Sequence, residues 1–152
     1  MSSWSDFAAA DVSIAGAFTR LLANEEVAYL ATAAADGRPR IHPFVPRIVE
    51  GRLVAFVLHT SPKCADLRGS GQYAIHSAQA PEDEEVYISG IAHDIDGDAV
   101  LRAAADIAMG FATGPADENH ILFEFTIDRA LWTRWLDFGT PDHRPERRLW
   151  TA

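Results

Sequence analysis

Two short glycine-containing turns, Asp36-Gly37 and Glu50-Gly51, divide the early part of the chain into three strand-like stretches. Turns of this length join antiparallel neighbours, whereas parallel strands need a crossover of about a dozen residues or more. The sequence therefore predicts an antiparallel meander rather than a series of crossovers. Its three strands are predicted over about 27–34, 38–49 and 52–59.

The middle strand of this meander carries three prolines, Pro39, Pro43 and Pro46. Proline cannot donate a ladder hydrogen bond, so we expect an edge, a bulge or a bend in this strand. The third strand, "LVAFVLH" (53–59), is continuously apolar, which is typical of a strand buried on both faces. This strand leads directly into a short helix.

The segment "HTSPKCADLRGSG" (59–71) has the signals of a helix of about two turns. Ser61 suits the N-cap, Pro62 suits the first helical position, and Gly69 suits the left-handed residue beyond the end. Lys63 then lies in the first turn, where the helix dipole favours an anion over an ammonium group. Two interpretations are open. Lys63 extends into water, or it joins Ser61 and the free backbone N–H groups in binding a phosphate.

Basic side chains follow the proline-bearing strand. Strand alternation places Arg38, Arg40 and His42 on one face, and it places Arg47 on the other unless a bulge changes the register. Such side chains are explained equally well as solvated charges that protect a sheet edge and as donors for an anionic ligand. The sequence alone leaves both explanations open.

The rest of the chain alternates helices and strands. An amphipathic helix is predicted over about 11–24, where apolar residues recur at helical spacing. Two strands over 72–78 and 84–95 are separated by an acidic, solvated loop over 79–85. Further along, we predict a helix marked by Val100, Leu101, Ala104, Ile107, Ala108 and Phe111 and capped by Asp96 or Asp98, then one or two closing strands over 120–128 and 130–138, and a polar tail from about 137.

This order of elements predicts a single, mainly β domain over residues 1–152, with six or seven strands and three helices. Short antiparallel strands with few helices usually close into a barrel or a sandwich, because closure removes unpaired edges. We therefore expect a small barrel.

Composition excludes several classes of function. The chain has 22 acidic and 13 basic side chains and a formal net charge of -9, which disfavours nucleic acid and anionic membranes as partners. It has one cysteine, no apolar run of about 20 residues, and a first segment, "MSSWSDFAAADV", without the charged and apolar regions of a signal peptide. A cytoplasmic location is therefore expected. The histidines form no close pair at metal-ligand spacing, so no metal site is predicted.

Three segments occur in an order that resembles the flavin-binding split-barrel superfamily, which includes pyridoxamine 5′-phosphate oxidase. They are "YLATAAADGRPRIHPFVPRI", "GRLVAFVLHTSPKCADLRGSGQYAIHSA" and "EEVYISGIA". The resemblance runs from about Val27 to Ile95 and is weaker through "FEFTIDRALWTRWL". It implies a six-stranded antiparallel split β-barrel with about three flanking helices, which forms a homodimer with two equivalent flavin mononucleotide (FMN) sites across the subunit interface. The implied activity is that of an FMN-dependent oxidoreductase with a small-molecule substrate.

The resemblance also implies which residues contact the cofactor, and it implies no catalytic side chain. Lys63, with Ser61 near it, corresponds to a basic residue that contacts the flavin phosphate in the family. Phe56 and Val57 would pass beside the isoalloxazine ring. Trp150 is expected to be disordered or to dock, either on a partner subunit or over one face of the ring. The strand "HPFVPR" adds His42, Phe44, Val45 and Arg47 as ring and phosphate contacts.

The chain departs from the oxidases at His42, Pro62 and Glu85, where they have arginine, a second basic residue and glutamine. We therefore expect a substrate other than pyridoxamine phosphate. The superfamily leaves three alternatives, which are a deazaflavin-dependent reductase, a flavin carrier or sensor without turnover, and a haem- or tetrapyrrole-binding relative. The acidic net charge favours FMN over a deazaflavin, because a deazaflavin carries an acidic tail.

Overall fold

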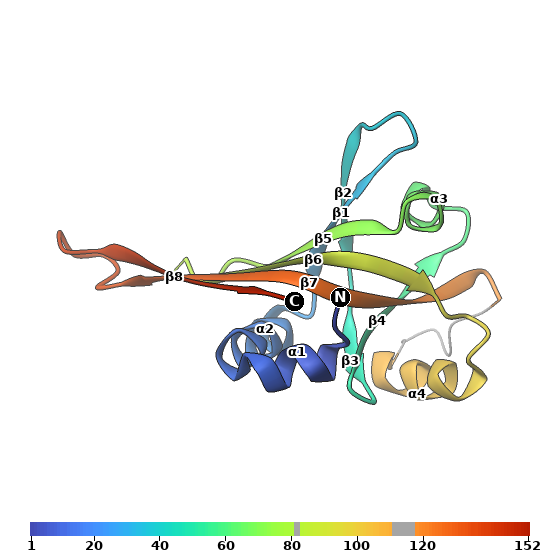
Figure 1. The fold of residues 1–152 in the computed structure, drawn as a ribbon, viewed down its shortest axis with the longest axis horizontal. Coiled ribbons are helices and arrows are strands. Elements are labelled where there is room, and N and C mark those ends of the chain that lie inside the picture. The colour runs from blue at the N-terminus through green and yellow to red at the C-terminus, as the bar shows by residue number, and fades with distance from the viewer. Residues whose placement is uncertain (81–82, 111–117) are drawn as a thin grey trace.

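The computed structural model describes residues 1–80, 83–110 and 118–152, which form four helices and eight strands (Figure 1). The helices are α1 (Trp4–Ala10), α2 (Val12–Glu25), α3 (Pro62–Gly69) and α4 (Ala99–Met109). The strands are β1 (Ala28–Ala33), β2 (Pro39–Phe44), β3 (Arg47–Val49), β4 (Arg52–Leu58), β5 (Gln72–Ser77), β6 (Glu85–Asp94), β7 (His120–Leu136) and β8 (Arg144–Thr151). None of the helices within these ranges is long and apolar enough to cross a membrane.

The strands form one antiparallel sheet in the order β2-β1-β5-β6-β7-β4-β3, with β8 paired to β7. The predicted antiparallel pairing across the two turns is therefore confirmed for β1 with β2 and for β3 with β4, but β2 and β3 stand at opposite ends of the strand order. Residues 38–49, however, are not one strand, because β2 ends at Phe44 and β3 begins at Arg47. Since three peptide steps span at most about 11 Å, the two ends of the strand order must lie close together. The sheet is thus curled into a half-barrel, and the bend falls at Val45 and Pro46.

The core lies inside the curled sheet and beneath its helices. Its largest fully buried side chains include Phe7, Phe18, Phe123 and Phe125. The predicted burial of the third strand on both faces is confirmed, because Leu53, Ala55 and Val57 belong to this core while Val54 belongs to a smaller cluster beneath α4. Figure 1 shows α1 and α2 side by side on one side of β6 and β7, and α3 on the other side.

The predicted amphipathic helix is confirmed as α2, and Asp11 caps it by accepting a hydrogen bond from the N–H of Ile14 at 3.1 Å. Helix α1 was not predicted. It is capped by Ser3, and it buries Trp4 and Phe7 against the core. A single aromatic pair in a seven-residue helix gives too little periodicity to stand out in the sequence.

The ends of α3 and the face of α4 differ from the predictions. Gly69 lies inside α3, and Gly71 instead takes the left-handed conformation with φ +69°. Asp98 caps α4. Val100 and Ile107 are 83% and 84% exposed, because α4 packs through the face that carries Leu101, Ala105 and Met109. Phe111, predicted on the same helix, lies outside the described residues, as do residues 81–82 of the acidic loop.

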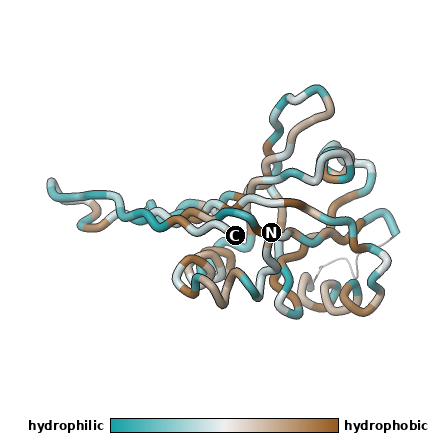
Figure 2. Tube along the Cα trace, in the orientation of Figure 1, coloured by the Kyte–Doolittle hydropathy of each residue, from teal (hydrophilic) through white to brown (hydrophobic). Residues whose placement is uncertain are grey.

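The predicted closing strands form one continuous strand, β7, whose pairing with β6 shifts register between Ser89 and Gly90. The polar tail expected from about 137 contains a strand that was not predicted, because residues 144–151 pair with β7 along the whole of β8. Together with the split of residues 38–49, β8 explains why the structure has more strands than the six of the predicted barrel. Past Glu85, the first residue of β6, the ribbon formed by β7 and β8 projects from the body, and Figure 2 shows largely hydrophilic residues along it.

Candidate functional site

The candidate site begins where the buried strand β4 ends. Ser61 follows β4, donates its hydroxyl hydrogen to the carbonyl of Leu58 at 2.7 Å and accepts from the N–H of Cys64 at 3.3 Å. Pro62 then starts α3, as the sequence predicts. The first turn of α3 therefore lies at the mouth of the half-barrel, held there by a side chain that caps both the strand and the helix.

Lys63 bends back from this turn onto strand β2. Its Nζ donates to the backbone carbonyl of Pro43 at 3.4 Å, which is a long contact. Among the residues that the structure describes, no carboxylate lies within ion-pair distance of this ammonium group. Lys63 is half-buried, and burial lowers the pKa of its ammonium group. It is therefore a partly desolvated cation with a single neutral partner.

His42 lies on β2 beside this cation. Its Nε2 is buried and has no hydrogen-bond partner. Every other buried side-chain nitrogen or oxygen in the described part of the chain has one. Burial lowers the pKa of His42, and so do the charges of Lys63 and Arg40, while Asp66 opposes them. Leaving such a nitrogen unsatisfied costs about 1–3 kcal/mol. An unpartnered imidazole beside an unpaired ammonium group is an arrangement that suits an anionic ligand.

A buried ion pair fixes β2 against α3. Arg40 Nη1 donates to both carboxylate oxygens of Asp66, at 2.8 and 3.0 Å, and the hydroxyl of Thr32 donates to the same carboxylate at 2.7 Å. Arg40 and His42 share one face of β2, as alternation predicts, whereas Arg38 pairs with Asp36 in the turn. Arg40 is therefore neither a solvated edge charge nor a free donor. No local sequence pattern marks Asp66 as a site residue, because its role depends on how α3 docks on the sheet.

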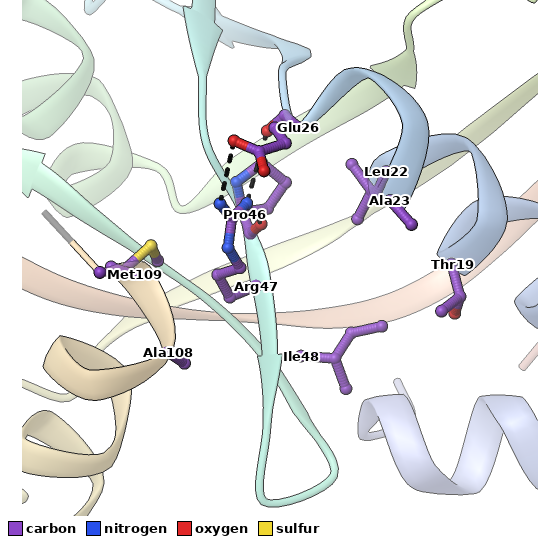
Figure 3. Close-up of a pocket in the computed structure, with 10 residues that line it drawn as sticks. Thr19, Leu22, Ala23, Glu26, Pro46, Arg47, Ile48, Ala108 and Met109 are labelled. Atoms are coloured by element: carbon purple, nitrogen blue, oxygen red, sulfur yellow. Dashed lines mark hydrogen bonds and ion pairs between the residues drawn. The ribbon is translucent and has the colours of Figure 1, made fainter.

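Arg47 does not join this cluster. Figure 3 shows its side chain directed toward Glu26 at the end of α2, in a pocket of about 520 Å³. Arg47 Nη1 donates to the carbonyls of Pro46 at 3.1 Å and of Glu26 at 3.5 Å, and Nη2 lies 3.7 Å from the Glu26 carboxylate. A cation at this position stabilises the C-terminal end of α2, where carbonyl groups lack helical partners.

The aromatic and aliphatic residues predicted to contact the cofactor lie in several places. Phe44 is buried with its ring centroid 5.8 Å from that of Phe125. Val57 is fully buried, and Val45 is 37% exposed. Phe56 faces α4, where the guanidinium of Arg102 lies 5.1 Å from its ring centroid. Phe44 and Val57 could therefore contact a ligand only through their backbone, whereas the side chains of Val45 and Phe56 are at least partly accessible.

Trp150 is docked rather than disordered. Its ring centroid lies 4.9 Å from that of Phe7 in α1, and its position on β8 is opposite Ala130 of β7. The next-but-one residue, Arg148, donates to Asp11 at 2.7 Å. The C-terminal strand is thus attached to the α1–α2 corner, on the side of β6 and β7 away from α3 in Figure 1. The contact between Trp150 and the cofactor stays a prediction.

The outer face of the sheet carries a row of mostly apolar side chains. The row crosses six strands, because residues directly opposite each other project from the same face. Two members, Tyr29 and Leu149, are 47% and 54% exposed, and Ile41 beside the row is 72% exposed. In register order the row consists of Pro43, Tyr29, His76, Tyr87, Leu131 and Leu149.

Metal ligation finds no support in the part of the chain that the structure describes, where no group of three or more histidine, cysteine, aspartate or glutamate side chains could hold an ion. Cys64 is buried, and burial raises the pKa of its thiol. It is therefore a core residue rather than an activated nucleophile. The groups gathered at the mouth of the half-barrel are Ser61, Lys63 and His42, with Arg40 and Asp66 behind them.

No family model and no curated protein sequence matches this chain. Solved structures do match it. A haem-binding protein from Mycobacterium smegmatis superimposes with a TM-score of 0.65 at 20% identity over 88% of this chain, which spans 57% of the length of that protein. PhzG from Burkholderia lata, in complex with tetrahydrophenazine-1-carboxylic acid, gives 0.60 at 19% identity, with 88% and 89% of the two chains covered. A putative pyridoxamine 5′-phosphate oxidase from Listeria innocua gives 0.61 at 14% identity, with 74% and 91% covered.

These similarities show the fold. The half-barrel has the split-barrel architecture of the pyridoxamine 5′-phosphate oxidase-like proteins, so the predicted fold is confirmed. The ligands named for the similar structures differ from one protein to the next, and they include haem and a phenazine carboxylic acid. The similarities therefore show the fold and select no ligand for this chain.

Proposed function

We propose that this chain is a homodimeric flavoprotein that binds FMN and acts as an oxidoreductase on a small molecule. The observation that carries the proposal is the pairing of Lys63 with His42 at the start of α3. Lys63 is a half-buried cation without a carboxylate partner, and His42 has a buried ring nitrogen without a hydrogen-bond partner.

A phosphate group fits these residues well. Pro62 has no N–H, and the N–H groups of Cys64 and Ala65 are bonded to Ser61, so the first turn of α3 offers an anion the N–H of Lys63. The Lys63 ammonium group adds a positive charge and the helix dipole favours negative charge at this end. His42 can donate to a phosphate oxygen. The flavin would supply the hydride or electron transfer, and the protein would bind and orient it. Ser61 would position the turn, since its hydroxyl already caps both neighbouring elements.

The outer sheet face supports a homodimer. The row from Pro43 to Leu149 and the adjacent Ile41 place exposed apolar surface across the sheet, and such patches mark interaction sites in proteins. His42 alternates with Ile41 and Pro43 on β2, so the site lies on the strand that would border the interface. A second copy seated on this face would approach the Lys63 contact at Pro43.

Haem is the second candidate ligand, because the similar structure from Mycobacterium smegmatis is described as a haem-binding protein. A deazaflavin is the third candidate ligand, since its phosphate suits Lys63. A flavin carrier without turnover would use the same site. The absorbance spectrum of the purified protein separates these ligands. Maxima at about 370 and 450 nm indicate a flavin, whereas a Soret band indicates haem.

The direct experiment is a titration with FMN, riboflavin and haem followed by spectroscopy. We expect saturable binding of FMN, with riboflavin weaker because it lacks the phosphate. Oxidation of a reduced nicotinamide by the FMN-loaded protein then distinguishes an enzyme from a carrier. A protein that binds neither FMN nor a deazaflavin would contradict the proposal, and tight haem binding with a Soret band would replace it.

A further inference from the structure

We propose that His42 makes binding at this site dependent on pH, because its imidazole takes up a proton when an anion binds beside Lys63. The inference concerns the regulation of the site in the proposed function, and its anion-binding part holds for any ligand that carries a phosphate group. It rests on the position of the ring, its unsatisfied nitrogen and the charges that surround it.

The charges facing His42 come from two elements. Helix α3 contributes Lys63 and Asp66, and strand β2 contributes Arg40. Asp66 is occupied by two hydrogen bonds from Arg40 and one from Thr32. On the neighbouring strand β1, the residue opposite His42 is the apolar Leu30. Lys63 is therefore the charged group near His42 that forms no ion pair, and its positive charge disfavours protonation of the ring.

A bound phosphate reverses this balance. Two negative charges beside Lys63 outweigh its single positive charge, so the anion favours the protonated imidazole. The protonated ring can then donate to the phosphate from a nitrogen that has no partner in the free protein. Since Nε2 is shielded from water in the free protein, the ring has to rotate before this nitrogen can meet a phosphate.

The direction of the pH dependence follows from linkage. In the free protein, burial and Lys63 lower the pKa of His42, so the ring is neutral near pH 7. A bound anion raises the pKa of the same ring. Anion affinity therefore increases as the pH falls through the bound-state pKa toward the free-state pKa. The phosphate itself takes up a proton at about pH 6, and this common effect is removed by comparison with a variant that lacks the imidazole.

The first measurement follows the histidine ring signals by NMR as inorganic phosphate is added. We expect phosphate to raise the pKa of His42 by about one unit, which corresponds to tenfold tighter binding to the protonated form. His143 lies in the exposed turn before β8 and serves as the internal reference, so its ring signals should respond to pH in the same way with and without phosphate. A His42 pKa that is unchanged at saturating phosphate would overturn the inference.

The second measurement compares FMN affinity at about pH 6.5 and about pH 8, by calorimetry, in the wild type and three variants. We expect affinity to rise about three- to tenfold at the lower pH in the wild type and in His143→Asn, which is the matched control. In His42→Asn the gain is lost. In His42→Arg binding stays tight at both values, because the guanidinium is always charged.

Equal pH dependence in the wild type and His42→Asn would contradict the inference even if FMN binds. If FMN does not bind, the proposed function fails, and the phosphate titration still decides the inference on its own. Thermal unfolding of each variant shows whether it remains folded, and His42→Arg gives a second test should His42→Asn unfold.

Discussion

Arg40 of β2 and Asp66 of α3 form a bifurcated contact, with Arg40 Nη1 2.8 and 3.0 Å from the two carboxylate oxygens. The contact joins the strand that carries His42 to the helix that carries Lys63. Asp66 is almost fully buried, so this pair is more than an exposed edge contact. It gives the candidate site a rigid base formed by two elements that are far apart in the sequence.

Replacing Asp66 with asparagine should weaken the contact between β2 and α3 and destabilise the fold. The variant leaves Arg40 without its carboxylate, and we expect the free energy of unfolding to fall by about 2–4 kcal/mol, as measured by urea denaturation. Arg38→Ala is the matched control, since its pair with Asp36 is exposed and should contribute less than about 1 kcal/mol. Similar small losses in both variants would show that the buried pair does not stabilise the fold.

Replacing Lys63 with alanine should weaken FMN binding. Loss of one charged hydrogen bond to phosphate costs about 1.5–3 kcal/mol, so we expect the dissociation constant to rise by roughly ten- to a hundredfold in a fluorescence titration. Riboflavin affinity should not change. Arg68→Ala is the control on the same helix, because Arg68 pairs with Asp94. Unchanged FMN affinity in Lys63→Ala would exclude Lys63 from the phosphate site.

Substituting alanine for Gly90 should disrupt the sheet. A Cβ at this position would lie 1.9 Å from the carbonyl oxygen of Thr126, at the register shift between β6 and β7. We expect a loss above about 3 kcal/mol or failure to fold, seen by circular dichroism and thermal unfolding. Gly16→Ala is the opposite control, since α2 leaves its Cβ unobstructed, and it should stabilise the chain by about 0.5–1 kcal/mol.

Replacing Trp150 with alanine should destabilise the fold through its contact with Phe7. Loss of this edge-to-face aromatic contact and its buried area should cost about 1–3 kcal/mol in urea denaturation. The same variant tests the predicted cofactor contact. If FMN affinity falls while stability is unchanged, Trp150 acts on the ligand, and the structural explanation is incorrect.

Placing a charge on the outer sheet face should dissociate the proposed dimer. Ile41 is 72% exposed in the single chain, so Ile41→Asp should leave the fold intact while it disfavours burial at an interface. We expect the wild type to elute as a dimer and the variant as a monomer in size-exclusion chromatography with light scattering. Val12→Asp, at an exposed position of α2, should remain dimeric. A monomeric wild type would contradict the dimer.

Local signals in the sequence were sufficient for several elements. The turns at Asp36-Gly37 and Glu50-Gly51 indicated antiparallel pairing, and the cap at Ser61 indicated the start of α3. These predictions succeeded because turn conformation and capping depend on residues that are neighbours in the chain. The resemblance of ordered segments added the split-barrel architecture, which the similar structures confirm.

Other features depend on contacts between distant segments. The prolines in residues 38–49 predicted an edge or a bend, which the structure confirms, but not that the two halves of this stretch lie at opposite ends of the strand order. The tail looked polar because β8 is an exposed strand whose stability comes from pairing with β7 rather than from burial. Of the α4 residues that helical spacing placed on one face, Leu101 and Ala104 pack against the core whereas Val100 and Ile107 are exposed, since spacing alone does not specify which side of a broad apolar face meets the sheet.

In the candidate site, local patterns were sufficient to place Lys63 in the first turn of a capped helix and His42 on the same strand face as Arg40. The folded chain adds that this strand face meets that helix, with Asp66 buried between them, and that Arg47 turns instead toward the end of α2. Capping and strand alternation act over a few residues, whereas desolvation and charge pairing depend on how the curled sheet brings β2 and α3 together.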